Sequence, residues 1–118
     1  MSRGGEGAEQ RAATFLEGRG LKIVTRNYRC RFGEIDLIAR SGATLVFVEV
    51  RARASEEFGG AAESITAAKR RRLIAAARHY LAAQREQRAC RFDVVLIRGA
   101  DSQLEWITNA FGEDGGRR

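Results

Sequence analysis

Apolar residues recur with a period of two in some stretches of this chain and at helical spacing in others. The longest alternating stretch runs from Gly33 to Arg53 and holds two apolar runs, Ile35–Ala39 and Ala43–Val50. These runs are rich in β-branched and aromatic residues and are separated by Arg40-Ser41-Gly42, which is typical of a β-hairpin. Because Val46–Val50 is apolar on both faces, we expect the second strand to be central in a sheet that is covered on both sides.

The hairpin pattern is interrupted by four charged residues: Glu34, Asp36, Glu49 and Arg51. An even-numbered loop centred on Ser41-Gly42 would give three opposed pairs: Ile38 with Leu45, Asp36 with Phe47, and Glu34 with Glu49. Side chains alternate along a strand, so seven of them would share one face: Glu34, Asp36, Ile38, Leu45, Phe47, Glu49 and Arg51. The other face would be core: Ile35, Leu37, Val46, Val48 and Val50.

In this register Asp36 and Glu49 are diagonal neighbours, with backbones roughly 7–8 Å apart. Two carboxylates at that separation can lean onto one divalent cation, which takes oxygen ligands at about 2.0–2.1 Å if it is magnesium. An odd-length loop or a bulge would break the register. The alternative interpretation of Glu49 and Arg51 is a solvated strand end that forms a salt bridge.

Five further elements complete the predicted order of helix, strand, hairpin, helix, strand and short strand. Their expected ranges are a helix over Ala8–Glu17, a strand over Leu21–Arg29, a helix capped by Ser64 or Thr66 and ending near Arg85, a strand over Arg91–Ile97 and a strand over Leu104–Thr108. The loop Ala52–Glu63, with Phe58, is either an ordinary connection or a flap over the charged face. Trp106 and Phe111 are expected in the core.

Helical spacing places two charged residues on otherwise apolar stripes. Glu9 lies on the stripe of Ala12, Ala13 and Leu16, and Lys69 extends the stripe of Leu73, Ala76, Ala77, Tyr80 and Leu81. Glu9 either complements the helix dipole or points into a polar site. The run Arg70-Arg71-Arg72 opposes the dipole of its helix start, so these residues either face solvent or meet a phosphate backbone.

The composition of the chain favours polyanions as its binding partners. The 118-residue chain carries a net charge of +6 and has a pI near 10.3. Such a balance favours nucleic acid first and an acidic membrane surface second. The alternative is that the abundant arginine reflects the nucleotide composition of the genome.

Several classes of site are excluded by residue counts. Cys30 and Cys90 are not in a metal-type spacing, so neither a disulfide framework nor a zinc site is expected. His79 is the only histidine, which excludes a His-based metal centre and a Ser/His/Asp triad. No leader-like or membrane-spanning apolar run is found, and we therefore expect a cytoplasmic protein without a membrane partner.

The hairpin motifs GEIDLIA and FVEVR, with RFDVV downstream, resemble the YraN family of small bacterial proteins. The likeness continues over further stretches and covers roughly residues 8–111: Glu9-x-x-Ala12, Asn27-x-Arg29, Phe58-Gly59, Lys69 and Asn109-Ala110-Phe111. That family in turn resembles Holliday-junction resolvases and belongs with the PD-(D/E)XK nuclease superfamily.

The resemblance implies an α/β fold of the restriction-endonuclease type, with a central mixed sheet of about five strands flanked by helices. It implies a single nuclease-like domain over residues 8–111 and flexible tails at 1–7 and 112–118. By the same resemblance Glu9, Asp36 and Glu49 would be ligands of Mg²⁺ or Mn²⁺. Ile35 stands where the superfamily has a proline before its catalytic aspartate, and Arg51 stands at the position of the motif lysine.

Arginine cannot act as a base because it keeps its proton, so Lys69 is the candidate to substitute for the motif lysine. The first functional hypothesis is an endonuclease for structured or branched DNA, with five candidate catalytic residues: Glu9, Asp36, Glu49, Arg51 and Lys69. The second is a non-catalytic nucleic-acid-binding module, and the third an interaction protein whose charged residues only form a buried salt-bridge network. A homodimer would suit an enzyme that cuts two strands.

Overall fold

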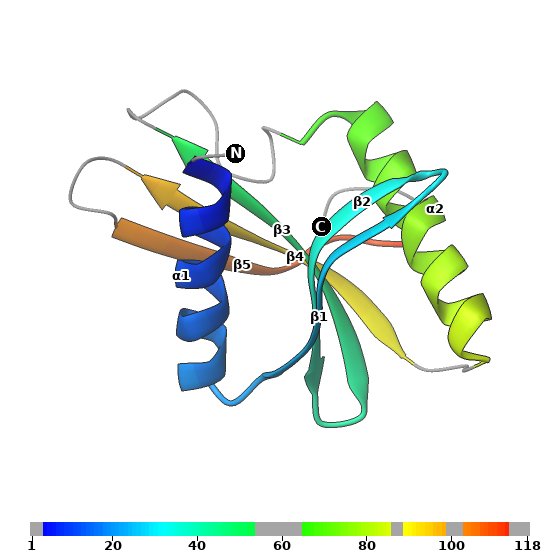
Figure 1. Cartoon of the computed structure of the whole chain (residues 1–118), viewed down its shortest axis with the longest axis horizontal. Helices are drawn as coiled ribbons and strands as arrows, with labels where there is room; N and C mark the ends of the chain where they lie inside the picture. Colours follow the sequence, from blue (N-terminus) through cyan, green and yellow to red (C-terminus); the bar gives the residue numbers. More distant parts are fainter. Residues whose placement is uncertain (1–3, 54–64, 86–88, 99–102, 114–118) are drawn as a thin grey trace.

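The described part of the chain forms one mixed five-stranded sheet with a helix on either face (Figure 1). The computed structural model describes residues 4–53, 65–85, 89–98 and 103–113. The elements, in chain order, are α1 (Gly4–Gly18), β1 (Lys22–Cys30), β2 (Gly33–Ser41), β3 (Thr44–Arg53), α2 (Ala67–Gln84), β4 (Cys90–Arg98) and β5 (Gln103–Phe111). The strands lie in their sequence order, and only the β3–β4 pair is parallel. The predicted α/β class and strand count are thereby confirmed.

The element boundaries differ from the predicted ones in several places. Helix α1 begins at Gly4 rather than at residue 8, and β5 extends through Asn109-Ala110-Phe111 instead of ending at Thr108. Strand β3 continues through Ala52 and Arg53, where a loop was predicted. The rest of that predicted loop, including Phe58, lies outside the described residues, as do residues 1–3 and 114–118 of the two predicted flexible tails, whereas residues 4–7 belong to α1.

Strand β3 is central and buried on both faces, as its apolar run predicted. Val46 and Val48 face the core beneath α1, together with Leu16 and Leu37. The alternate residues of β3 face a second core that is covered by α2 and contains these aromatic residues: Phe47, Tyr80, Phe92 and Phe111. The two helices therefore cover opposite faces of the same strand.

The predicted pairing of the β2–β3 hairpin was wrong by two residues. Ile38 opposes Phe47 rather than Leu45, and the turn residues are Gly42 and Ala43. Gly42 has a φ of 60°, the left-handed value that a tight two-residue turn needs and glycine adopts easily. A shift of two leaves each side chain on its predicted face, because faces alternate with period two.

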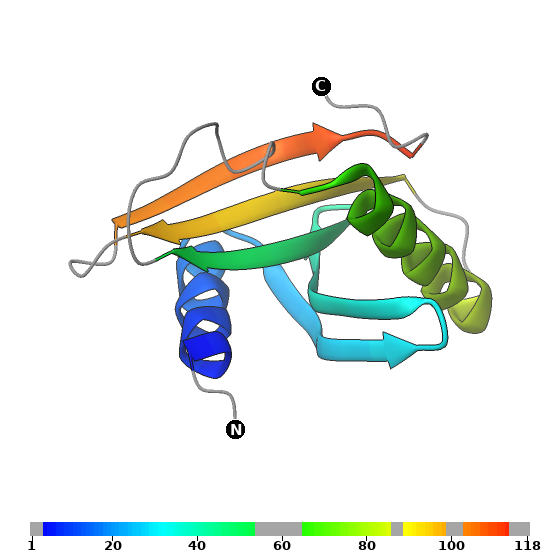
Figure 2. The same cartoon turned by 90° about the horizontal axis from the view of Figure 1, so that it is seen from above.

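Ile35 is the exception to the predicted faces, because it joins the core beneath α2 and not the core that contains Leu37. The ladder between β2 and β3 runs from Ser41–Thr44 to Leu37–Val48. Beyond it β2 bends away from β3 toward α2 while it stays paired with β1 (Figure 2). At the bend the backbone N–H of Val50 donates to Asp36 Oδ2 at 2.8 Å, so a side chain takes the place of a strand partner.

Helix α2 begins with the predicted cap at Thr66, whose Oγ1 accepts a hydrogen bond from the backbone N–H of Lys69 at 3.0 Å. Arg70, which was expected to face solvent or a phosphate, is half-buried, and its Nη1 donates to the carbonyl of Ile65 at 2.7 Å. The first turn is thereby fixed at both the cap and the preceding residue. Lys69 is placed one turn before the buried Leu73, as the sequence predicted.

Buried Asp93 ties β5 to β4. Its carboxylate accepts hydrogen bonds from Trp106 Nε1 at 3.0 Å, from the backbone N–H of Asn109 at 2.9 Å and from Arg91 Nε at 3.0 Å. The β4–β5 register shifts between Phe92 and Val94, and Asn109 takes a φ of 54°. The Asp93 carboxylate thus gives the Asn109 N–H an acceptor beside the irregular register. No described helix is long and apolar enough to cross a membrane.

Candidate metal centre

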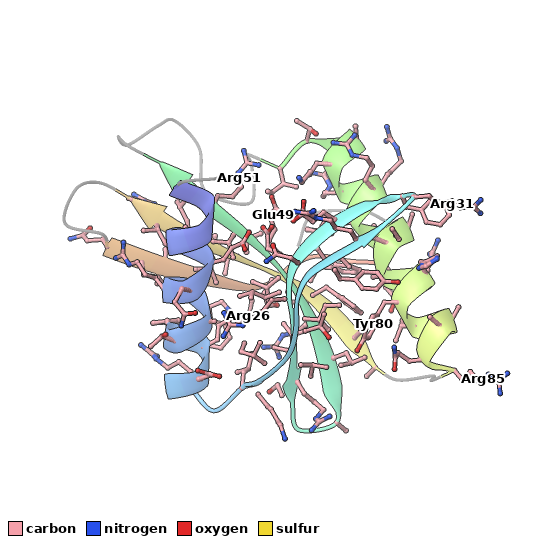
Figure 3. All side chains as sticks on the ribbon, viewed as in Figure 1. Arg26, Arg31, Glu49, Arg51, Tyr80 and Arg85 are labelled. Atoms are coloured by element: carbon pink, nitrogen blue, oxygen red, sulfur yellow. The ribbon has the colours of Figure 1, made fainter. Side chains whose placement is uncertain are left out.

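A group of carboxylates gathers where β2 leaves β3, between the N-terminal halves of α1 and α2. Glu9 comes from α1, Asp36 from β2 and Glu49 from β3. Figure 3 shows Glu49 between the two helices, with Arg51 farther along β3. The bend in β2 makes room for these side chains, because it separates β2 from β3 where the two strands would otherwise stay paired.

Three carboxylates offer oxygens within 4.8 Å of one another: those of Glu9, Glu34 and Asp36. Asn27 lies beside them with a φ of 53°. With its amide nitrogen facing the acids, Asn27 donates to Glu9 Oε1 at 2.9 Å and to Glu34 Oε2 at 3.2 Å. One strand residue in the left-handed conformation thus joins the acids of α1 and β2.

Glu49 adjoins this group and is only 5% exposed. Two cations contact its Oε2 at 3.6 Å, Arg51 through Nη1 and Lys69 through Nζ. Asp36 shares hydrogen bonds with both Glu9 and Glu49, which requires a proton on the glutamic acid in each case. Asp36 is therefore the link between the α1 side and the α2 side of the site.

The carboxyls of the site hold their protons more tightly than isolated acids do. Burial and the neighbouring charge of Asp36 raise the pKa of Glu9 to about 7. Burial and the same neighbouring charge raise the pKa of Glu49 to about 7, although Lys69 and Arg51 oppose the shift. Burial also raises the pKa of Asp36, against the hydrogen bond from Val50. Carboxyls crowded in this way are electrostatically unfavourable once all are ionised, and an added cation would relieve the repulsion.

All of the candidate site residues named from the sequence meet in this one region: Glu9, Asp36, Glu49, Arg51 and Lys69. Sequence reasoning missed two participants. Glu34 had been placed on the face of Asp36 by strand alternation, but it was not considered as a possible ligand. Asn27 was named only as part of the family resemblance and was given no role, because its role depends on a left-handed backbone at one position in β1.

The donor set suits a hard divalent cation. Every candidate ligand is a carboxylate oxygen, which is the preference of Mg²⁺, Mn²⁺ and Ca²⁺ rather than of zinc. In the described residues neither cysteine lies in a disulfide. Glu9, Glu34 and Asp36 are close enough to bind one ion together, and Glu49 could join through its contact with Asp36.

The metal-free protein should lose stability as pH rises. Glu9 and Glu49 have pKa values near 7 in the fold, against an ordinary value of 4.5. The folded state therefore holds more protons than the unfolded chain between these values, so the contribution to stability is complete below about pH 4.5 and is lost as pH passes about 7. Urea unfolding at pH 5 and pH 8 in EDTA measures the change. A free energy of unfolding that does not fall between these pH values, or that falls equally in Asp36→Asn, would contradict this origin.

Comparison with known proteins places the site in a family context. The model of the uncharacterised protein family UPF0102 matches residues 8–97. A UPF0102 protein of Nitrosomonas europaea is 60% identical over 110 residues, which cover 92% of this chain and 93% of the relative. UPF0102 proteins of Ralstonia pickettii and Aeromonas hydrophila are 57% and 54% identical and cover 93% and 91% of this chain, and 90% and 83% of their own lengths.

Proposed function

The chain belongs to the uncharacterised protein family UPF0102, and from its site we propose that it is an Mg²⁺- or Mn²⁺-dependent endonuclease-like protein that acts on or binds structured nucleic acid, branched DNA in particular. One observation carries the proposal. Acids from three elements, Glu9, Asp36 and Glu49, converge beside Lys69 and Arg51 in a protein of net charge +6. Acids that can bind a metal, surrounded by cations that can bind phosphate, are what phosphodiester hydrolysis needs.

The topology supports assignment to the PD-(D/E)XK nuclease superfamily, with its restriction-endonuclease-like core. A hairpin carries the motif acids, and its second strand is joined through α2 to the parallel strand β4. The resemblance of GEIDLIA and FVEVR to that superfamily falls on Asp36 and Glu49, which the fold brings into contact. Holliday-junction resolvases are the branch of the superfamily that this likeness favours.

A bound Mg²⁺ or Mn²⁺ would be held by Asp36 with Glu9, Glu34 or Glu49, and would supply activation of water and compensation of phosphate charge. The residues of the chain have separate tasks around it. The N–H of Val50 fixes the orientation of the Asp36 carboxylate. Lys69 and Arg51 contact Glu49 Oε2, which opposes the rise in its pKa, and they present positive charge to a phosphate.

Lys69→Met should lower metal-dependent cleavage by about 100-fold or more, the range of a general acid or base, whereas Arg51→Lys should change it by less than about 10-fold. Both cations contact Glu49, but only an ammonium can release a proton. Initial rates on a labelled branched substrate measure the effect. The matched control is Lys22→Met, which removes the other lysine of the chain from an exposed position on β1. Undiminished cleavage by Lys69→Met would instead leave Arg51 as the important cation.

The second candidate function is a non-catalytic nucleic-acid-binding module that retains the nuclease fold. It is favoured by Arg51 at the position of the motif lysine, since an arginine cannot take up a proton from water. A third candidate, an interaction protein, would use the ion pairs of Glu49 only as a structural network.

A cleavage assay on four-way junction, flap, duplex and single-stranded substrates, in DNA and RNA, tests the proposal. Metal-dependent cleavage is the expected result, with none in EDTA. Binding that weakens steeply with salt while the substrate stays intact would favour the non-catalytic module. Absence of binding at any salt concentration would leave the interaction protein.

A further inference from the structure

The turn between β1 and β2 exposes an aromatic ring beside an arginine. Phe32 is 37% exposed, and among the described residues the only other large apolar side chain with comparable exposure is Val24 at 38%. The guanidinium carbon of Arg31 lies 4.9 Å from the centroid of the Phe32 ring. Figure 3 shows Arg31 at the tip of the hairpin, directed away from the body of the protein.

A ladder of aromatic residues holds this ring in place. The Phe32 and His79 ring centroids are 5.9 Å apart, with an angle of 62° between the planes. His79 Nδ1 is hydrogen-bonded to the hydroxyl of Tyr28 at 2.5 Å, and Tyr28 meets buried Tyr80 edge-on at 5.2 Å. The tip is thus anchored through α2 to the core, and an exposed ring that is held in position gives up little conformational freedom when it binds a partner.

The tip is close to the candidate metal centre along the same strand. Glu34 follows Phe32 by two residues, which corresponds to about 7 Å of strand. Helix α2 runs alongside: Lys69 contacts Glu49, Arg72 lies beneath Gly33, and His79 contacts Phe32. From Lys69 to His79 this row is about 15 Å long.

The positive charge around the tip indicates the class of partner, and the Phe32 ring indicates which part of that partner it contacts. The end of β1, the tip and α2 carry five exposed arginines, of which Arg29 is paired with Glu34: Arg29, Arg31, Arg71, Arg72 and Arg78. Together with the net charge of +6 they favour a polyanion over a neutral or basic protein surface. A base offers its face to an aromatic ring only where it is unstacked, so the ring favours unpaired nucleotides over continuous duplex.

We propose that Phe32, supported by His79 and with the Arg31 guanidinium over one face of its ring, is a stacking platform for an unpaired base of bound nucleic acid. The inference rests on the proposed function and adds a substrate feature to it. Because Glu34 follows Phe32 by only two residues, the stacked base would lie within a few nucleotides of a phosphate at the acidic group. The preferred substrate would then carry an unpaired nucleotide next to the position of metal-dependent chemistry.

The test is binding in EDTA, which needs no catalysis. The probes are labelled oligo-dT of about 12 nucleotides, an abasic oligonucleotide of equal length and a blunt duplex. Phe32→Leu keeps an apolar side chain but removes the ring, Phe32→Trp restores a ring, and Val24→Ala is the control for loss of exposed apolar surface. We expect Phe32→Leu to weaken oligo-dT binding by about five-fold or more without changing abasic binding. Phe32→Trp should bind as wild type, with fluorescence quenching beyond that of Trp106.

Arg31→Gln should weaken binding of all three probes by similar factors. It should also lower the slope of log affinity against log salt concentration by about one, the value for one phosphate contact.

Equal oligo-dT affinity of Phe32→Leu and wild type would overturn the stacking proposal and leave the nuclease proposal intact. The same holds if wild type binds the abasic probe as tightly as oligo-dT. It also holds if poly-glutamate binds wild type as tightly as oligo-dT does and loses as much affinity in Phe32→Leu. A wild type that binds none of the probes, and cuts nothing with metal, would refute both proposals. Loss of stacking in Phe32→Leu together with absent cleavage would support the platform on a non-catalytic module.

Discussion

Asp36→Asn should abolish the response of the protein to divalent metal ions and should raise the stability of the metal-free fold at pH 8. Asp36 interacts with both Glu9 and Glu49, and its charge raises the pKa of each. An asparagine keeps an oxygen for the Val50 N–H but removes the charge, so the repulsion falls and the fold is retained. Stability and metal binding are therefore expected to change in opposite directions, which a general folding defect could not produce.

The measurement is the free energy of unfolding at pH 8 in EDTA and in Mn²⁺. Wild type should gain about 2.7 kcal/mol at a metal concentration 100 times the dissociation constant, and Asp36→Asn should gain almost nothing. Metal-dependent cleavage should fall by more than about 100-fold, since even residues that only support a metal ligand are worth 10- to 100-fold.

Glu105→Gln is the matched control for Asp36→Asn. It neutralises a carboxylate on β5 that is paired with Arg98 at 2.6 Å and is not one of the acids of the site. Metal response should survive in this variant. An equal Mn²⁺-induced stabilisation of wild type and Asp36→Asn would show that Asp36 is not a ligand.

Asp93→Ala should lower the free energy of unfolding by about 3–5 kcal/mol, the range seen when one partner of a buried ion pair is removed. Asp93 is 1% exposed, and three donors converge on it from Arg91, Trp106 and Asn109. Truncation leaves the indole N–H and a backbone N–H without their acceptor and leaves a cavity in the sheet. Asp93→Asn, which keeps one acceptor oxygen, should lie between alanine and wild type.

Urea denaturation with tryptophan fluorescence suits this measurement, because Trp106 is itself a partner of Asp93. Glu105→Gln again serves as the control, and loss of its surface ion pair should cost no more than about 1 kcal/mol. A loss below about 1 kcal/mol for Asp93→Ala would mean that water replaces the carboxylate as the acceptor for these donors. Asp93 lies in the RFDVV stretch of the family resemblance, and its hydrogen bonds give this residue a structural role that needs no part in catalysis.

The local pattern of apolar and polar residues was sufficient to predict the helices and strands and most of the faces on which their side chains lie. The alternation in β2 and β3 placed Asp36, Glu49 and Arg51 on one face, and helical spacing pointed Glu9 and Lys69 toward the sheet. The pairing within the hairpin was beyond this reasoning, because two even-numbered turns one residue apart give the same alternation. In the structure Gly42 alone of the three loop residues has a positive φ, which suits a hairpin turn in which it is the first central residue.

Ile35 and Glu34 show a second limit of the sequence. Alternation assumes a strand that stays in the plane of its sheet, whereas β2 bends after Leu37 and carries Ile35 into the core beneath α2. The bend brings Glu34 near Glu9, a neighbour that no spacing along β2 could predict.

The sequence by itself determined which residues carry charge on apolar faces, the order of the elements and the central position of β3, since each depends on neighbours within a few positions. Only the tertiary structure decided that α1, β2, β3 and α2 meet at one point, with Asp36 linking Glu9 to Glu49. That meeting depends on where β2 leaves β3. The packing of the β1–β2 hairpin against α2 accompanies the bend, with Tyr28 against Tyr80 and Gly33 over Arg72. Contacts between residues so far apart in the chain are set by packing of the whole domain and leave no periodic trace in the sequence.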